Sequence, residues 1–84
     1  MKEIITETLY GYMLKNKSGK YLNEKHNWSD YSNRTMEFGT LQECMDVKSS
    51  RPTAIVIRIM LRHTTIPGIG MIKTERIESV EQLD

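Results

Sequence analysis

The sequence has few of the residues that form covalent frameworks or cross membranes. A single cysteine, Cys44, among 84 residues excludes an internal disulfide and is typical of a reducing cytosol. No apolar run approaches the roughly 20 residues of a membrane span, and residues 1–15 lack the basic start and apolar block of a signal peptide. We therefore expect a protein of the cytoplasm that does not enter a membrane.

The chain also lacks a large excess of charge of either sign, because 12 basic residues face 11 acidic ones, for a net charge of +1. It is therefore not a polycation as a whole. Its charges are segregated, however, since residues 48–76 contain only one acid, Glu75. The basic residues of that segment are Lys48, Arg51, Arg58, Arg62, Lys73 and Arg76. Such segregation either builds a positive face on a nearly neutral protein or arises by chance in a short chain.

The usual signatures of a metal site, a cofactor site or an active site are missing. His26, Cys44 and His63 lie far apart, without the close spacing of zinc ligands. No nucleophile-elbow sequence occurs. The Gly68-Ile69-Gly70 turn joins two predicted strands, whereas a phosphate-binding loop runs from a strand into a helix. We expect a protein without metal, cofactor or catalytic activity.

One enzymatic alternative stays open, a metal-free nuclease. It would use His63 as general base, His26 as its partner, and Arg58 and Arg62 to bind phosphate. We favour a non-enzymatic protein, because His63 lies where a predicted strand ends and polar residues are common there.

What the sequence does contain is a long alternating run, Ala54–His63. Its isoleucines and Leu61 recur at every second position, which predicts a strand with one buried face. The other side carries Arg58 and Arg62 among apolar residues, and Lys73 or Arg76 is expected opposite them on the next strand. Either this arginine side forms a binding face, or a helix covers the isoleucine side and the arginines are simply solvated.

Other segments predict the remaining elements. Residues 9–24 form a hairpin around the turn 16–19, with Tyr10, Tyr12 and Leu14 on one face, and Ile4-Ile5 extends its first strand backwards. Residues 23–33 predict a loop in which Trp28 either covers the core or anchors a partner.

Residues 34–38 predict a further strand, followed by a helix that Thr40 and Glu43 cap and that ends before Pro52. Residues 64–70 predict a turn, 71–77 the last strand and 79–82 a short helical turn. The sequence therefore predicts one α+β domain over residues 1–84. It consists of an antiparallel sheet of about five strands with one main helix on one face, in the order β-β-β-α-β-β.

Several of these segments carry a family resemblance: Gly11-Tyr12-Met13-Leu14, Gly19-Lys20-Tyr21-Leu22, Trp28 and the junction Met36–Cys44. Over residues 9–60 the chain resembles small phage-encoded accessory proteins, in which a GKYL hairpin precedes a loop tryptophan and an F-x-T-x-x-E strand-to-helix junction. Cys44 stands where those proteins usually have a small alanine. The resemblance implies a protein that binds and blocks or redirects a host factor, including components of antiviral defence.

We therefore expect a non-enzymatic accessory protein that inhibits or redirects a host protein or RNA in the host cytoplasm. The alternative is an RNA- or single-stranded nucleic-acid-binding protein that uses a basic strand face, with tyrosines and Trp28 as stacking rings. The residues expected to bind the partner are Trp28, Arg58, Arg62, Lys73 and Arg76. A second copy docking on the uncovered sheet face, and an edge strand pairing with another chain, are the further routes left open.

Overall fold

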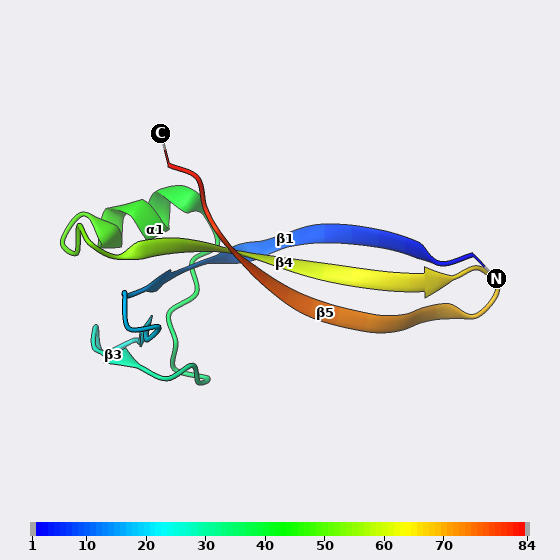
Figure 1. Cartoon of the computed structure of the whole chain (residues 1–84), viewed down its shortest axis with the longest axis horizontal. Helices are drawn as coiled ribbons and strands as arrows, with labels where there is room; N and C mark the ends of the chain where they lie inside the picture. The colour runs from blue at the N-terminus through cyan, green and yellow to red at the C-terminus, as the bar shows by residue number, and fades with distance from the viewer. Residues whose placement is uncertain (1, 84) are drawn as a thin grey trace.

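The computed structural model describes residues 2–83, which form an antiparallel sheet and a helix (Figure 1). The elements are β1 (Ile4–Lys15), β2 (Tyr21–Leu22), β3 (Trp28–Ser29), α1 (Leu41–Lys48), β4 (Ile55–Ile66) and β5 (Gly70–Val80). The five strands lie in the order β3-β2-β1-β4-β5, and each pairs antiparallel with its neighbour. The predicted α+β fold and its element order are confirmed.

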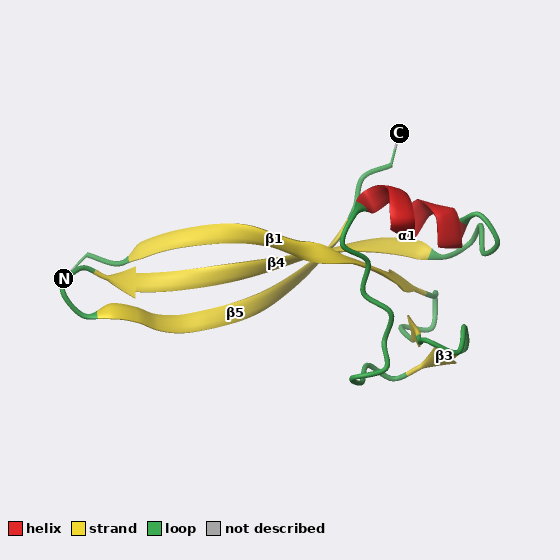
Figure 2. Cartoon of the chain, turned by 180° about the vertical axis from the view of Figure 1, so that it is seen from behind, coloured by secondary structure: helices red, strands yellow, loops and turns green. Residues whose placement is uncertain are grey.

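The molecule is elongated, measuring 49 × 28 × 20 Å with a radius of gyration of 15.2 Å. A compact domain of this length would have a radius of gyration of about 12 Å. The difference comes from β1, β4 and β5, which run away from the rest as a three-stranded ribbon (Figures 1 and 2). We call residues 4–9, 60–66 and 70–77 the arm, and the remainder, with α1, β2 and β3, the head.

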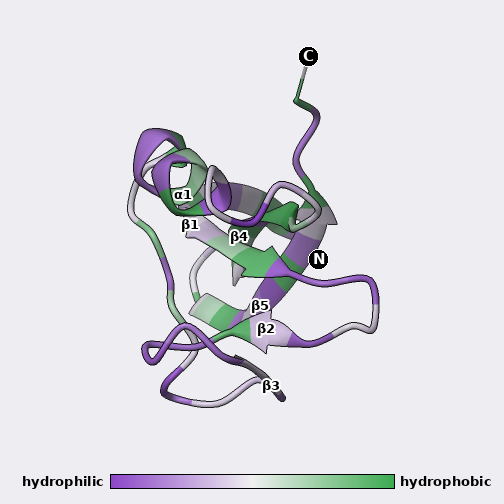
Figure 3. Cartoon of the chain, turned by 90° about the vertical axis from the view of Figure 1, so that its left-hand side faces the viewer, coloured by the Kyte–Doolittle hydropathy of each residue, from purple (hydrophilic) through white to green (hydrophobic). Residues whose placement is uncertain are grey.

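The core lies in the head, on both faces of the sheet. A first cluster fills the space between α1 and the sheet: Tyr12, Leu14, Leu22, Phe38, Cys44, Ala54 and Val56. A second, smaller cluster of Met13, Ile57 and Ile59 lies on the opposite face, with Tyr21 and Ile55 packed against it. Figure 3 looks along the length of the molecule into the head, where apolar strand segments lie beside α1.

The helix covers the face of β4 that carries Val56 and Arg58, not the isoleucine face. Val56 pairs with Leu14, and both belong to the cluster beneath α1, whereas Ile57 and Met13 pair on the far side. The interpretation with the helix on the isoleucine side is therefore wrong. Both sides of β4 are apolar within the head, so alternation alone does not decide which one the helix covers.

The helix begins where the capping pattern predicts. The Thr40 hydroxyl accepts a hydrogen bond from the Glu43 amide (3.2 Å) and donates one to the Glu43 carboxylate (3.0 Å), which satisfies an otherwise unpaired amide of the first turn. At the other end, the Ser49 amide donates to the Met45 carbonyl (3.0 Å) and the chain turns before Pro52.

A β-bulge interrupts β1 at Tyr10. Leu9 pairs with Met60 and Gly11 with Ile59, so Tyr10 is the extra residue. Tyr12 faces α1, but the Tyr10 ring lies against Arg76, on the side of β5 that continues the Ile57 face. The expectation that Tyr10, Tyr12 and Leu14 share one face is therefore wrong for Tyr10.

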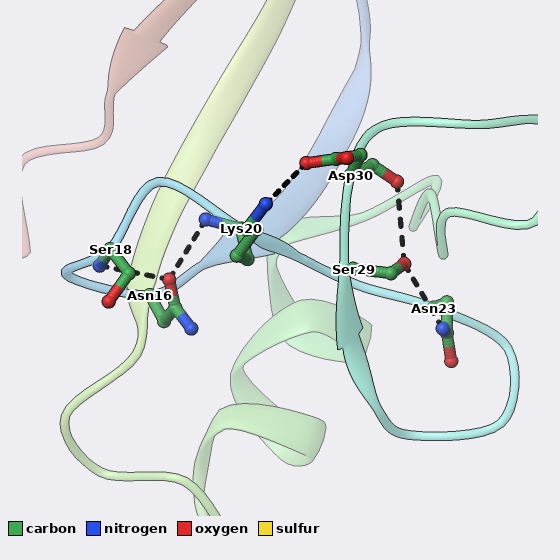
Figure 4. Close-up of polar contacts among 6 residues, drawn as sticks. All are labelled: Asn16, Ser18, Lys20, Asn23, Ser29 and Asp30. Carbon is green, nitrogen blue, oxygen red and sulfur yellow. Dashed lines mark hydrogen bonds and ion pairs between the residues drawn. The ribbon is translucent and has the colours of Figure 1, made fainter.

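The third strand forms in the segment predicted to be a loop. Asn23 is the cause, because its side-chain oxygen accepts hydrogen bonds from the amides of Lys25 (3.0 Å) and Asn27 (3.1 Å), and this Asx turn folds Trp28–Ser29 back onto β2. The side-chain nitrogen Nδ2 of Asn23 also donates to the Ser29 hydroxyl, as Figure 4 shows. Residues 34–38, predicted as a strand, contribute only two isolated bridges, Thr35 to Asn23 and Phe38 to Tyr12.

The turn of the first hairpin forms as predicted, whereas the second is shorter than the predicted 64–70, because β4 continues to Ile66 and β5 begins at Gly70. The Asn16 side chain accepts hydrogen bonds from the amides of Ser18 and Lys20 (Figure 4), and Gly19 takes a φ of 82°. The predicted helical turn at 79–82 is wrong, because β5 continues to Val80 and the Glu81 amide donates to the Val56 carbonyl (2.9 Å).

Gly11 is required by the close approach of the chain at Phe38. A Cβ at Gly11 would lie 2.6 Å from the Phe38 carbonyl oxygen, which the bridge to Tyr12 holds in place. We expect Gly11→Ala to lower the free energy of unfolding by about 2 kcal/mol or more, measured by urea denaturation. Gly39→Ala is the control, since its new Cβ meets nothing closer than 4.0 Å; equal losses in both variants would contradict the packing account.

Candidate binding surfaces

The predicted site residues do not form one face. Arg58 and Arg62 lie on the α1 side of the sheet, as does Lys73, which pairs with Thr64. Arg76 pairs with Leu61 and lies on the opposite side. The residues opposite Arg58 and Arg62 on β5 are Ser79 and Glu75 rather than further basic residues.

Each of the four basic residues has an acidic partner. Arg58 Nε lies 3.5 Å from Glu81 Oε2, and Arg62 Nη2 lies 3.0 Å from Glu7 Oε2. Lys73 Nζ lies 3.6 Å from Glu75 Oε1, and Arg76 pairs with Glu37. Three of the acids come from outside the segment whose basic excess suggested a positive face. The sheet therefore carries ion pairs where the sequence suggested a basic strip: Glu7 is the cross-strand partner of Arg62, Glu75 lies on the same strand as Lys73, and Glu37 reaches Arg76 from the loop before α1.

Arg76 is the most enclosed of the four. Its side chain is 28% exposed and that of Glu37 is 25% exposed. The guanidinium carbon lies 5.4 Å from the centre of the Tyr10 ring and 5.0 Å from that of Tyr31, distances at which the cation and the ring faces attract. Arg76 thus binds the loop of Tyr31 and Glu37 to β5.

Two further tyrosine contacts complete this cluster. The Tyr31 hydroxyl donates to Glu37 (3.0 Å), and burial together with this hydrogen bond raises the pKa of Tyr31. Tyr21 packs edge-on against Tyr31 at 5.4 Å and donates to Glu78 (3.1 Å). The sequence offered these tyrosines as stacking rings. The bulge turns Tyr10 toward Arg76, and Tyr31 reaches Arg76 from the loop after β3.

Trp28 lies apart from the arginines. It pairs with Leu22 in β3 and packs, partly buried, against the core cluster beneath α1. Trp28 packs on the α1 side of the sheet within the head, whereas Arg76 lies on the opposite side and Lys73 lies on the arm, so Trp28 does not form one surface with them. Two roles were expected for Trp28, covering the core or anchoring a partner, and its packing agrees with the first.

The arm carries a surface that the sequence analysis did not identify. Five large apolar side chains at its far end are 47% to 64% exposed: Ile4, Ile5, Ile69, Met71 and Ile72, called here the arm tip. Ile4 and Met71 both pair with Thr65 and lie on one face of the ribbon, whereas Ile5 pairs with Thr64 on the other face and Ile69 lies in the turn between β4 and β5. The arm tip therefore exposes apolar side chains on both faces of the ribbon. The sequence signal that could have indicated the arm tip is the set of apolar residues that flank the Pro67-Gly68 turn.

The groups considered for catalysis are separate. Cys44 is fully buried in α1, and burial raises its pKa to about 11. His63 lies on the arm, where its Nδ1 is 3.2 Å from the Thr74 hydroxyl. Residues 2–83 contain no cluster of three or more His, Cys, Asp or Glu side chains able to hold a metal ion.

Comparison with protein-family models, curated proteins and solved structures found no match. The function must therefore be argued from the surfaces of the chain itself. Within the described part of the chain, no helix is long and apolar enough to cross a membrane.

The pair of Arg76 and Glu37 should stabilise the head. Glu37→Gln leaves an enclosed guanidinium without its carboxylate, so we expect the free energy of unfolding to fall by about 1–3 kcal/mol, measured by urea denaturation. Glu24→Gln is the matched control, because Glu24 pairs with Arg34 at 3.8 Å on the open surface and should change stability by less than about 0.5 kcal/mol. Equal effects would show that the Arg76 pair is no more than a surface pair.

Cys44 should be unreactive in the folded protein. With its pKa raised to about 11, the thiolate fraction at about pH 8 is roughly 100-fold lower than for an ordinary thiol, and the side chain is enclosed as well. We expect iodoacetamide to modify Cys44 at least about 100-fold more slowly in the native protein than in denaturing urea, as followed by mass spectrometry. Rapid modification of the native protein would contradict the burial of Cys44 under the helix.

Proposed function

We propose that this chain is a non-enzymatic accessory protein, of the kind that phages encode, which binds a host protein in the host cytoplasm through its arm tip. By occupying that protein it inhibits or redirects it, and components of antiviral defence are the class of target that we favour. The observation that carries the proposal is the exposed apolar arm tip on a ribbon whose charges are paired.

The arm tip is suited to a protein partner because its exposed apolar side chains favour a complex in which they are removed from water. Full burial of one large aliphatic side chain is worth about 1.5–3 kcal/mol, and five such side chains gather there. Exposed apolar side chains that gather at one end of a small protein commonly mark an interaction site. The partner is therefore a protein with an apolar surface or groove that receives the end of the ribbon.

The charges of the sheet favour a protein over a nucleic acid. Binding to phosphates depends on lysines and arginines that replace counterions along the backbone. Here Arg58, Arg62 and Lys73 are already paired with Glu81, Glu7 and Glu75, and a phosphate would have to displace those carboxylates. Nucleic-acid binding remains an outcome that the experiment distinguishes.

The test is a pull-down from bacterial lysate with the tagged protein, divided into nuclease-treated and untreated halves. Ile69→Lys and Met71→Lys each place a charge in the arm tip. Asn33→Lys adds the same charge on an exposed loop of the head. We expect one stoichiometric protein partner in both halves, reduced about tenfold or more by either tip variant and unchanged by Asn33→Lys.

Two results would overturn the proposal. A partner list that collapses after nuclease treatment would identify an RNA-binding protein. A protein partner that the tip variants retain at wild-type levels would show that another surface makes the contact. Circular dichroism of each variant confirms that the fold is intact, which is expected because both tip residues lie outside the core.

A further inference from the structure

We propose that β5 also pairs with β5 of a second copy of this chain, edge to edge and antiparallel. β5 is an edge strand of eleven residues. In the described chain its backbone hydrogen bonds run to β4, including the continuation at Glu81. An edge of this length offers a row of free amides and carbonyls to another strand.

The outward-facing amides can be identified from one hydrogen bond. The Glu81 amide donates to the Val56 carbonyl (2.9 Å), and the direction of backbone groups alternates along a strand. Over the regular register from Lys73 onward, odd-numbered residues therefore turn their amides to β4. The amides of Thr74, Arg76, Glu78 and Val80 point to the open edge.

The sequence of β5 is charge-complementary to itself about Ile77. In a twofold antiparallel pair, the residue on the axis opposes itself, and residues equally far from it oppose each other on the same face. With Ile77 on the axis, Arg76 opposes Glu78 of the second copy, and Lys73 opposes Glu81. Arg76, Lys73 and Glu81 keep their partners within the chain, so each new contact extends an existing ion pair. By symmetry each of these opposite-charge pairs occurs twice. Val80, which is 57% exposed in the single chain, is placed opposite Thr74.

Neighbouring registers lack this complementarity. An axis at Glu75 or at Arg76 would place that charged residue against itself. An axis at Thr74 pairs Lys73 with Glu75, but it includes residues 71–73, where the register is irregular. The free edge of β1 has Glu7 at its middle, which would likewise oppose itself. The opposite-charge pairs and the regular strand register therefore favour a twofold axis at Ile77 over these alternatives.

This dimer is independent of the proposed function and compatible with it. The axis lies near the head end of β5, and antiparallel pairing directs the two arms in opposite directions. Each arm then runs beside the head end of the other copy's β5, and the dimer presents one arm at each of its ends.

Cysteine cross-linking tests the register directly. Residues opposite each other on paired strands have Cβ atoms about 4.5–5.5 Å apart, close to the spacing of a disulfide. We expect Ile77→Cys to give disulfide-linked dimer under mild oxidation. Glu75→Cys, two residues away on the same face, should give about tenfold less, because residue 75 opposes residue 79. The native Cys44 is buried and does not compete.

Sedimentation of the chain without added cysteines provides the second measurement. We expect a dimer of twice the 9.8 kDa mass. Lys73→Glu should weaken self-association about tenfold, because it creates two like-charge contacts with Glu81. Lys17→Glu, the same charge change in the exposed 16–19 turn, should leave the dissociation constant unchanged.

A monomer at all accessible concentrations would overturn this inference without affecting the proposed function. So would a dimer that cross-links equally well through positions 75 and 77, or one that Lys73→Glu does not weaken. The side chain of Lys73 is 60% exposed, so this variant is expected to fold.

Discussion

The difference in length between the helix and the strands is the constraint on which the rest of this structure depends. An eight-residue helix such as α1 extends about 12 Å, whereas a twelve-residue strand such as β4 extends about 40 Å. The helix therefore covers only one end of the β1–β4 ribbon, and the core forms there. Backbone pairing with β1 and β5 continues well beyond it, so the arm is a single layer that the head covers only at its base, where Glu37 and Tyr31 contact Arg76.

A single-layer arm leaves two kinds of surface incomplete, its apolar end and its free edges. Stable domains usually bury the apolar side of a sheet against a second layer, and along the arm this chain provides none. The charged side chains of the arm are balanced within it, Arg62 by Glu7 and Lys73 by Glu75. What the arm offers to other molecules is therefore apolar contact at its tip and backbone hydrogen bonds at the edge of β5. These are the two surfaces through which we propose that another protein binds.

The sequence predicted those features that local chemistry determines. The alternation in Ala54–His63 located β4, and Thr40 with Glu43 located the start of α1. The face covered by the helix was not predictable, since both sides of β4 are apolar in the head. The partners of the basic residues could not be predicted either, because Glu37 and Arg76 lie 39 positions apart and the bulge at Tyr10 turns that ring toward Arg76. Contacts of that kind depend on register, which a single sequence does not specify.

The central claim is that a second protein molecule pairs with the free edge of β5. Residue-resolved amide hydrogen exchange at low and high protein concentration tests it most directly. In dilute solution the inward amides of Ile77 and Ser79 should exchange slowly and the outward amides of Arg76 and Glu78 rapidly. At high concentration the outward amides should become protected as well, because a second strand then accepts their hydrogen bonds. Outward amides that exchange rapidly at every concentration would contradict pairing at this edge.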